Sequence, residues 1–156
     1  MDRDRLAIGR STAQKPQDQE GENMKFYCLG YYDVEKWDAM SESERNDLID
    51  ECFAYDDVLR RNGHVAGGDG LQGPQDTRTI KWKNGKAVAS TGPYAKTKEQ
   101  LGGILVLEAR DLDHAIQLIS NHPGVRNGPF EIRQVEDMSA IMAESVRRRS
   151  GARKAS

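Results

Sequence analysis

Cysteine and histidine are scarce in this sequence. Its two cysteines, Cys28 and Cys52, share no Cys-x-x-Cys spacing and both fall inside expected secondary structure. We therefore expect two reduced core thiols, and neither a disulfide framework nor a zinc site. The three histidines are scattered along the chain, so they predict no metal site. No motif implies a cofactor.

Long apolar runs are also missing. The longest one, Ile104–Leu107, is far shorter than the roughly 20 residues that a membrane-spanning helix needs. Residues 1–23 alternate charges and amides, and they contain no apolar stretch typical of a secretory signal. We therefore expect a cytoplasmic protein that does not cross a membrane.

No excess of positive charge marks the chain as a whole. Its net charge of −2 does not provide the excess of positive charge that nucleic-acid-binding proteins carry, so we do not expect nucleic acid as a partner. The C-terminus differs, because residues 137–156 hold five basic side chains and two acidic ones. No aromatic residues are interleaved with these cations, and we interpret the segment as a solvated tail.

The composition divides the chain into three zones. Residues 1–23 are too polar to offset the entropy of ordering, and we expect them to form a flexible leader. Residues 24–136 form the expected folded domain. Residues 137–156 predict a short basic helix and tail, with Arg147–Arg149 in the last turn. This helix could pack on its own domain, on a second copy or elsewhere.

The first half of the domain predicts a strand, a helix and a second strand. The apolar run Lys25–Tyr32 is typical of a strand covered on both faces. A capping box at Ser41 and Glu44 predicts a helix over Glu42–Arg61 that stops at Gly63. A strand is expected at His64–Ala66, and the next four residues, which include three glycines, are expected to interrupt it.

The second half opens with a hairpin over Arg78–Ser90. Asn84-Gly85 is the preferred pair for a tight type I′ turn, which places Ile80 and Trp82 opposite Ala89 and Ala87. A central strand at Leu101–Ala109 follows. Asp111 is then expected to cap a second helix, which ends before Pro123. The last strand is expected at Phe130–Val135.

This order of elements predicts an α+β fold, a ferredoxin-like sandwich with an inserted β-hairpin. Two helices cover one face of such a sheet and leave the other bare. The strands Phe26–Tyr32 and Ile104–Leu107 are apolar on both faces, so the bare face needs a partner. Packing of two copies about a two-fold axis is the simplest solution, and we expect a homodimer.

Three segments carry a resemblance to a known family. Thr91–Gly103 resembles the Asp-Gly-Pro-Phe-Ala-Glu-Thr-Lys-Glu signature of the DGPF branch of YCII-related proteins, Gly67–Leu71 resembles its Gly-Gly-Glu-Gly-Leu loop, and Glu131–Arg133 resembles its closing strand. The resemblance covers residues 24–136 and implies a dimeric α+β barrel. Departures from the family pattern occur at four positions: Thr91, Tyr94, Lys96 and Gln134. Thr91 stands where the family has an acid, and Lys96 puts a base where the family has another acid.

The resemblance also implies a pair of residues suited to acid–base chemistry. The better-known members carry a histidine on the first helix and an aspartate in an Asp-Pro step after the second helix. Here the helix Glu42–Arg61 contains no histidine, and the step reads His122-Pro123. The pair is therefore not expected in this chain, and His122 is interpreted as a complement to the helix dipole.

Candidate site residues remain in two places. His64 could act as a general base with Asp69, and a partly exposed structural histidine is the alternative. The second group lies in the segment between the hairpin and the central strand. Its residues could line a binding site, and the alternative is a loop held by ion pairs. These candidate binding residues are Gly92, Pro93, Tyr94, Lys98 and Glu99.

Three classes of function follow from these patterns. The first is a small-molecule pocket near Gly67–Leu71 and Gly92–Glu99, which could also be catalytic. The second is a regulatory or interaction module, since the resemblance implies a link to sigma-factor-dependent transcription. The third is nucleic-acid binding by the tail. Convergence of Asp69, Lys98 and Glu99 on one concave site would favour the first class over the second.

Overall fold

Four strands form one antiparallel sheet in the order β2-β5-β1-β6 in the computed structural model, which describes residues 21–154. The α+β class is therefore confirmed. The sheet is open, with β2 and β6 at its edges, and the described part of the single chain forms no closed barrel. The expected leader at 1–23 lies almost wholly outside the described residues. The strands are β1 (Met24–Asp33), β2 (Val65–Gly70), β5 (Glu99–Ala109) and β6 (Phe130–Gln134).

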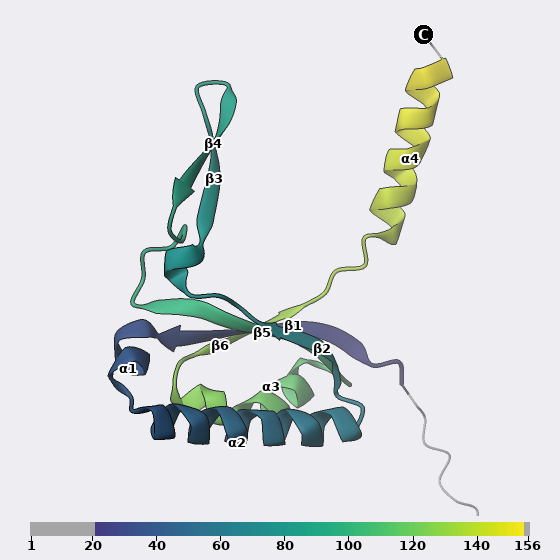
Figure 1. Ribbon diagram of the computed structural model, residues 1–156. Coiled ribbons are helices and arrows are strands. Elements are labelled where there is room, and N and C mark those ends of the chain that lie inside the picture. Colours follow the sequence, from purple (N-terminus) through teal and green to yellow (C-terminus); the bar gives the residue numbers. More distant parts are fainter. Residues whose placement is uncertain (1–20, 155–156) are drawn as a thin grey trace, which may run out of the picture.

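Two helices, α2 (Glu42–Arg61) and α3 (Leu112–Ser120), cover one face of this sheet (Figure 1). The capping box is present as predicted: the Ser41 hydroxyl accepts from the Glu44 amide at 3.2 Å, and the Glu44 carboxylate accepts from the Ser41 amide at 2.8 Å. Gly63, at a φ of 76°, follows the end of α2. Asp111 caps α3 by accepting from the His114 amide. Both helix starts are therefore confirmed.

The hydrophobic core lies between the sheet and these two helices. Alternate residues of β1 and β5 point into it because successive side chains of a strand face opposite sides. Cys28 is one of them, and burial raises the pKa of its thiol to about 11. The fully or almost fully buried apolar residues are Phe26, Cys28, Leu59, Leu107, Ala109, Ala115 and Ile119.

The structure departs from several of the expected elements. The glycines after Ala66 do not interrupt β2, because their backbones pair with Gly103–Val106 of β5, and this pairing needs no side chain. β5 begins at Glu99, two residues before the prediction. A short helix, α1 (Val34–Ala39), was not predicted; Asp33 caps it by accepting from the Lys36 amide. Two short 3₁₀ turns also occur, η1 (Pro74–Asp76) and η2 (Pro123–Arg126).

Two elements project from the face of the sheet opposite the helices (Figure 1). The first is the hairpin β3 (Arg78–Lys83) and β4 (Lys86–Thr91), whose predicted register is confirmed: Ile80 pairs with Ala89 and Trp82 with Ala87. The second is α4 (Ser139–Lys154), which stands apart from the sheet and the other helices. The tail helix is confirmed, but Arg147–Arg149 lie near its middle and not in its last turn, because the helix continues to Lys154.

None of the helices in residues 21–154 is both long and apolar enough to span a membrane.

Candidate functional site

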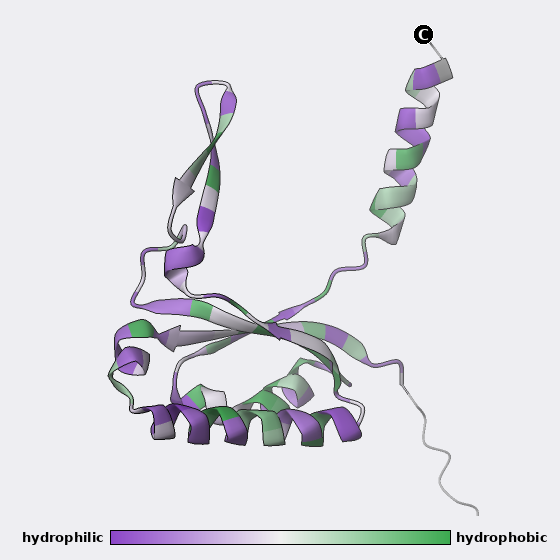
Figure 2. Cartoon of the chain, viewed as in Figure 1, coloured by the Kyte–Doolittle hydropathy of each residue, from purple (hydrophilic) through white to green (hydrophobic). Residues whose placement is uncertain are grey.

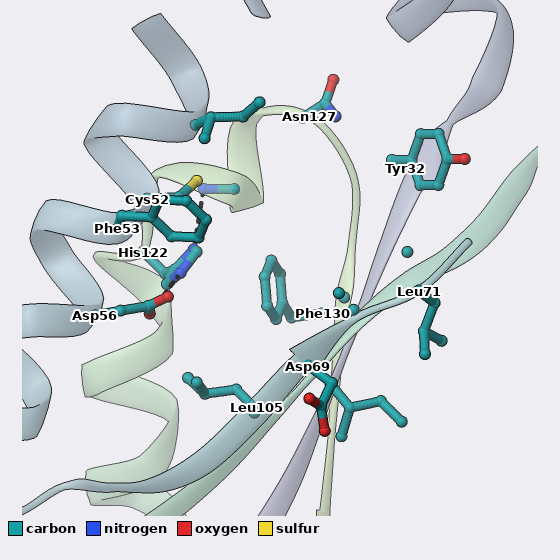
Figure 3. Close-up of a pocket in the computed structure, with 18 of the residues that line it drawn as sticks. Tyr32, Cys52, Phe53, Asp56, Asp69, Leu71, Leu105, His122, Asn127 and Phe130 are labelled. Carbon is teal, nitrogen blue, oxygen red and sulfur yellow. Dashed lines mark hydrogen bonds and ion pairs between the residues drawn. The ribbon is translucent and has the colours of Figure 1, made fainter. Parts of the chain in front are cut away.

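A cavity of about 850 Å³ lies where α2 passes over β1, β2 and β5 (Figure 3). Its wall combines apolar and ionisable side chains, as is usual for sites that bind small molecules. The apolar side chains include those of Trp37, Leu48, Ile49, Phe53, Leu105 and Phe130; the polar ones include those of Asp56, Asp57, Arg60, His122 and Asn127.

The cavity exists because a row of glycines crosses the sheet beneath α2. Gly70 pairs with Gly103, and Gly103 pairs with Gly30, so the three glycines lie side by side on adjacent strands. Gly30 follows the buried Cys28 by two residues, which places this row on the helix-facing side. A Cβ atom built on Gly70 would meet nothing within 4 Å, and one on Gly103 would meet only the Asp69 carbonyl oxygen at 3.5 Å. The backbone therefore forms the floor of the cavity.

A buried histidine and an aspartate lie in contact on the cavity wall. The imidazole Nε2 of His122 lies 3.2 Å from Oδ1 of Asp56, and Nδ1 accepts from the Gly124 amide at 3.0 Å. In the neutral ring, the nitrogen that accepts carries no proton, so Nε2 carries the proton and donates it to Asp56. Both ring nitrogens are thus engaged. His122 is 7% exposed, and the Asp56 side chain is 19% exposed.

Aromatic neighbours hold this imidazole in place. The Tyr55 ring lies edge-on to His122 with 5.7 Å between centroids, and the Phe130 ring lies 5.1 Å away. The Tyr55 hydroxyl donates to the Leu118 carbonyl at 2.6 Å, which ties α2 to α3. The orientation of His122, and with it the Asp56 carboxylate, is therefore fixed by packing as well as by hydrogen bonds.

Two further polar groups lie on the cavity wall. The Asn127 Oδ1 atom is buried without a hydrogen-bond partner among the described residues, although buried polar atoms are normally paired. Cys52 faces the same space; burial, with a smaller contribution from the Asp56 charge, raises the pKa of its thiol. A donor group on a ligand would satisfy Asn127. In residues 21–154, no three His, Cys, Asp or Glu side chains are grouped closely enough to hold a metal ion.

Asp69, Lys98 and Glu99 do not converge on one concave site, which was the feature expected to favour a small-molecule pocket over an interaction module. Asp69 lines the cavity, but it pairs with Ile104 on the face of the sheet opposite the helices, and Figure 3 shows its carboxylate on the far side of β2 from His122. Lys98 and Glu99 are not part of the cavity wall. Instead, the Lys98 Nζ atom forms an ion pair with Oδ2 of Asp33 at 3.1 Å. The case for a small-molecule site therefore rests on other residues, and the binding roles of Lys98 and Glu99 stay predictions.

His64 lies at the other end of β2 from Asp69. Its Nδ1 lies 3.0 Å from the Glu108 carbonyl oxygen, and its ring packs edge-on against that of His114, with 5.1 Å between centroids. No hydrogen bond joins His64 to Asp69 in residues 21–154. The catalytic role assigned to them stays a prediction, and the structural alternative accounts for every contact of His64 that we observe.

The remaining predicted binding residues lie at the base of the hairpin. Gly92 donates its amide to the Thr77 carbonyl at 2.8 Å and accepts from the Thr79 hydroxyl at 2.8 Å. The Lys81 ammonium lies over the Tyr94 ring at 5.2 Å, within range of a cation–π interaction. In the described structure, Gly92 and Tyr94 therefore contact the hairpin and its base, and none of Gly92, Pro93 and Tyr94 lines the cavity. Their binding role stays a prediction.

Sequence reasoning missed Asp56 and His122 as a pair. Asp56 is one of seven acids on α2, and His122 was interpreted through the helix dipole alone. The available signal was the resemblance itself, which implies a histidine on the first helix and an aspartate before a proline. The structure brings an aspartate and a histidine into contact, but here the aspartate lies on α2 and the histidine precedes Pro123.

Comparison with known proteins agrees with the resemblance. The model of the family described as YCII-related domain matches residues 24–139, which is most of the chain. The chain therefore belongs to the YCII-related family. No match is found among the curated proteins.

Proposed function

We propose that this protein binds a small molecule in the cavity beneath α2, and that Asp56 accepts a hydrogen bond from it. The observation that carries this proposal is the contact between Asp56 and the buried His122 on the cavity wall. A carboxylate held by a fixed donor is a preorganised acceptor, which reduces the cost of ordering it when a ligand binds. The unpaired Asn127 oxygen in the same wall supports a ligand that carries more than one donor.

The chemistry of the pair follows from its hydrogen bonds. Because both nitrogens of His122 are engaged, the imidazole is not free to take a proton from a ligand. Asp56 is therefore the group that would contact a hydroxyl or amine, and His122 would position it. The same geometry would let Asp56 act as a general base toward a bound hydroxyl or an acidic carbon, if the protein is an enzyme.

A pair of matched variants tests this role. A thermal-shift screen against a metabolite library identifies ligands, and calorimetry then measures their dissociation constants. Asp56→Asn keeps the size of the side chain and removes its charge, so we expect affinity to fall by about 10-fold or more, on the scale of a lost charged hydrogen bond. Asp50→Asn, an exposed aspartate on α2 outside the cavity wall, should leave affinity unchanged. Equal affinities in both variants would contradict the proposal.

We further propose that two copies of this ferredoxin-like sandwich pack through their bare sheet faces as a dimeric α+β barrel. Tyr27 and Leu29 of β1 alternate with the buried Phe26 and Cys28, so they point away from the helices, and their partners in β5 are Val106 and Ile104. These four side chains form an apolar patch that the described part of a single chain leaves partly exposed. A second copy would cover it.

An arginine placed in this patch should separate the two copies. Sedimentation at micromolar concentration is expected to show two chains for the native protein and one for Val106→Arg, because an unpaired charge would be buried at the seam. Val58→Arg, a similar change on the helix layer, where Val58 is 39% exposed, should remain dimeric. A native protein that is monomeric at these concentrations would rule out this assembly.

A regulatory or interaction module is the second candidate. The observation that favours it is the exposure of large apolar side chains on the hairpin and on α4. The link to sigma-factor-dependent transcription remains an expectation from the resemblance.

A further inference from the structure

The projecting hairpin has two different faces. Ile80 and Trp82 lie on one face, opposite the small Ala89 and Ala87, and they are 71% and 75% exposed. The other face carries Lys81 opposite Val88. Figure 2 shows that the apolar residues of this hairpin lie well away from the core. The arrangement is that of an amphipathic ribbon whose apolar face is uncovered.

An uncovered ribbon of this kind is not expected to persist by itself. Isolated two-stranded hairpins are marginally stable in water, and they need packing against another layer. The hairpin stands up from the bare face of the sheet, on the side where the proposed second copy would lie (Figure 1). Its own chain offers no packing layer there in the described residues.

The length of the hairpin matches the thickness of a second copy. Each of its strands has six residues, which span about 20 Å at roughly 3.3 Å per residue. Sheets pack face to face at about 10 Å, and a helix layer of roughly 10 Å lies beyond the partner's sheet. Ile80 and Trp82, the third and fifth residues of β3, would therefore stand on either side of the level of the partner's sheet, and the tip level with its helices.

Charge at the tip agrees with this position. The hairpin carries four cations (Arg78, Lys81, Lys83 and Lys86) and no acid. Helix α2 carries seven acids (Glu42, Glu44, Asp47, Asp50, Glu51, Asp56 and Asp57) against three arginines (Arg45, Arg60 and Arg61). A basic tip that reaches the acidic helix layer of the partner is electrostatically complementary.

We propose that the hairpin of each protomer clasps the edge of a second copy of this chain, with Ile80 and Trp82 packed against it and the lysines of the tip facing its α2. The clasp rests on the sheet-face dimer proposed above. The clasp gives Ile80 and Trp82, which belong neither to the core nor to the cavity wall, a surface to pack against.

Trp82 itself supplies the test. In a Trp37→Phe background it is the only tryptophan, so acrylamide quenching of its fluorescence reports its exposure. We expect quenching to fall on dimerisation, and to stay high in the monomer produced by Val106→Arg.

In sedimentation equilibrium, the double change Ile80→Ala and Trp82→Ala should weaken the dimer by about 10-fold or more, the scale of an interface anchor. Val88→Ala, on the opposite face of the hairpin, should change it by less than about twofold.

The outcomes separate the clasp from the sheet-face dimer. If the double variant leaves the affinity of the dimer unchanged, and Trp82 in the Trp37→Phe dimer is quenched as strongly as in the monomer, the clasp is overturned and the sheet-face dimer stays intact. A native protein that stays monomeric would overturn both. Protection of Trp82 only when a single-stranded oligonucleotide is added at low salt would assign the hairpin to nucleic acid and overturn the clasp.

Discussion

Replacing Gly128 with Ala is expected to destabilise the protein by at least about 3 kcal/mol, the upper range for forcing extra atoms into a packed site. A Cβ atom at this position would lie 1.9 Å from the Tyr31 carbonyl oxygen and 2.7 Å from its carbonyl carbon. These are backbone atoms of a central strand, so they cannot move aside as a flexible side chain can. The next residue, Pro129, accepts the Tyr31 amide at 2.9 Å, which holds the two segments together.

Urea unfolding measures this effect directly. The control is Gly67→Ala, a glycine in β2 whose added Cβ would lie 4.0 Å from a methyl group of Val106, an ordinary van der Waals contact. We expect that change to stay within about 0.5–1 kcal/mol, the scale of ordinary substitutions. Similar stabilities for the two variants would mean that the approach of Gly128 to β1 is looser than described.

Replacing Gly103 with Val is expected to abolish ligand binding, with a loss of at least about 100-fold, since a branched side chain would occupy the floor of the cavity. Gly103 lies in the middle of the glycine row, and a Cβ there has only one neighbour within 4 Å. Valine suits a strand, so the fold should remain as stable as that of the native protein within about 1 kcal/mol.

A graded series separates filling of the cavity from unfolding. Gly103→Ala adds a single methyl group and should reduce affinity less than Gly103→Val, while urea unfolding reports the stability of both. If the valine variant keeps its native affinity for a screened ligand, that ligand does not bind in this cavity.

The elements that could be predicted from the sequence are those set by interactions between residues close together in the chain. The capping box of Ser41 and Glu44 set the start of α2, and Asn84-Gly85 set the register of the hairpin. Asn84 has a φ of 50° and Gly85 a φ of 75°, the positive values that a type I′ turn requires. Such signals need no knowledge of the tertiary structure.

The cavity was beyond sequence reasoning because contacts distant along the chain create it. Gly30 and Gly103 become neighbours only through the register of β1 and β5, and Asp56 meets His122 across 66 positions of sequence. The glycines of β2 were interpreted as an interruption, since glycine is unfavourable inside strands. Their pairing with β5 overrides that preference, and the same absence of side chains opens the space beneath α2.

The contact between Asp56 and the buried His122 limits how this pair can change by mutation. A single change at either position, Asp56→His or His122→Asp, gives two histidines or two aspartates at the contact. Two carboxylates in one buried site repel and cannot both be charged, and two imidazoles lose the ion that orients them. Each single variant is therefore expected to form a weaker contact than the native pair, so the effects of substitutions at positions 56 and 122 depend on each other.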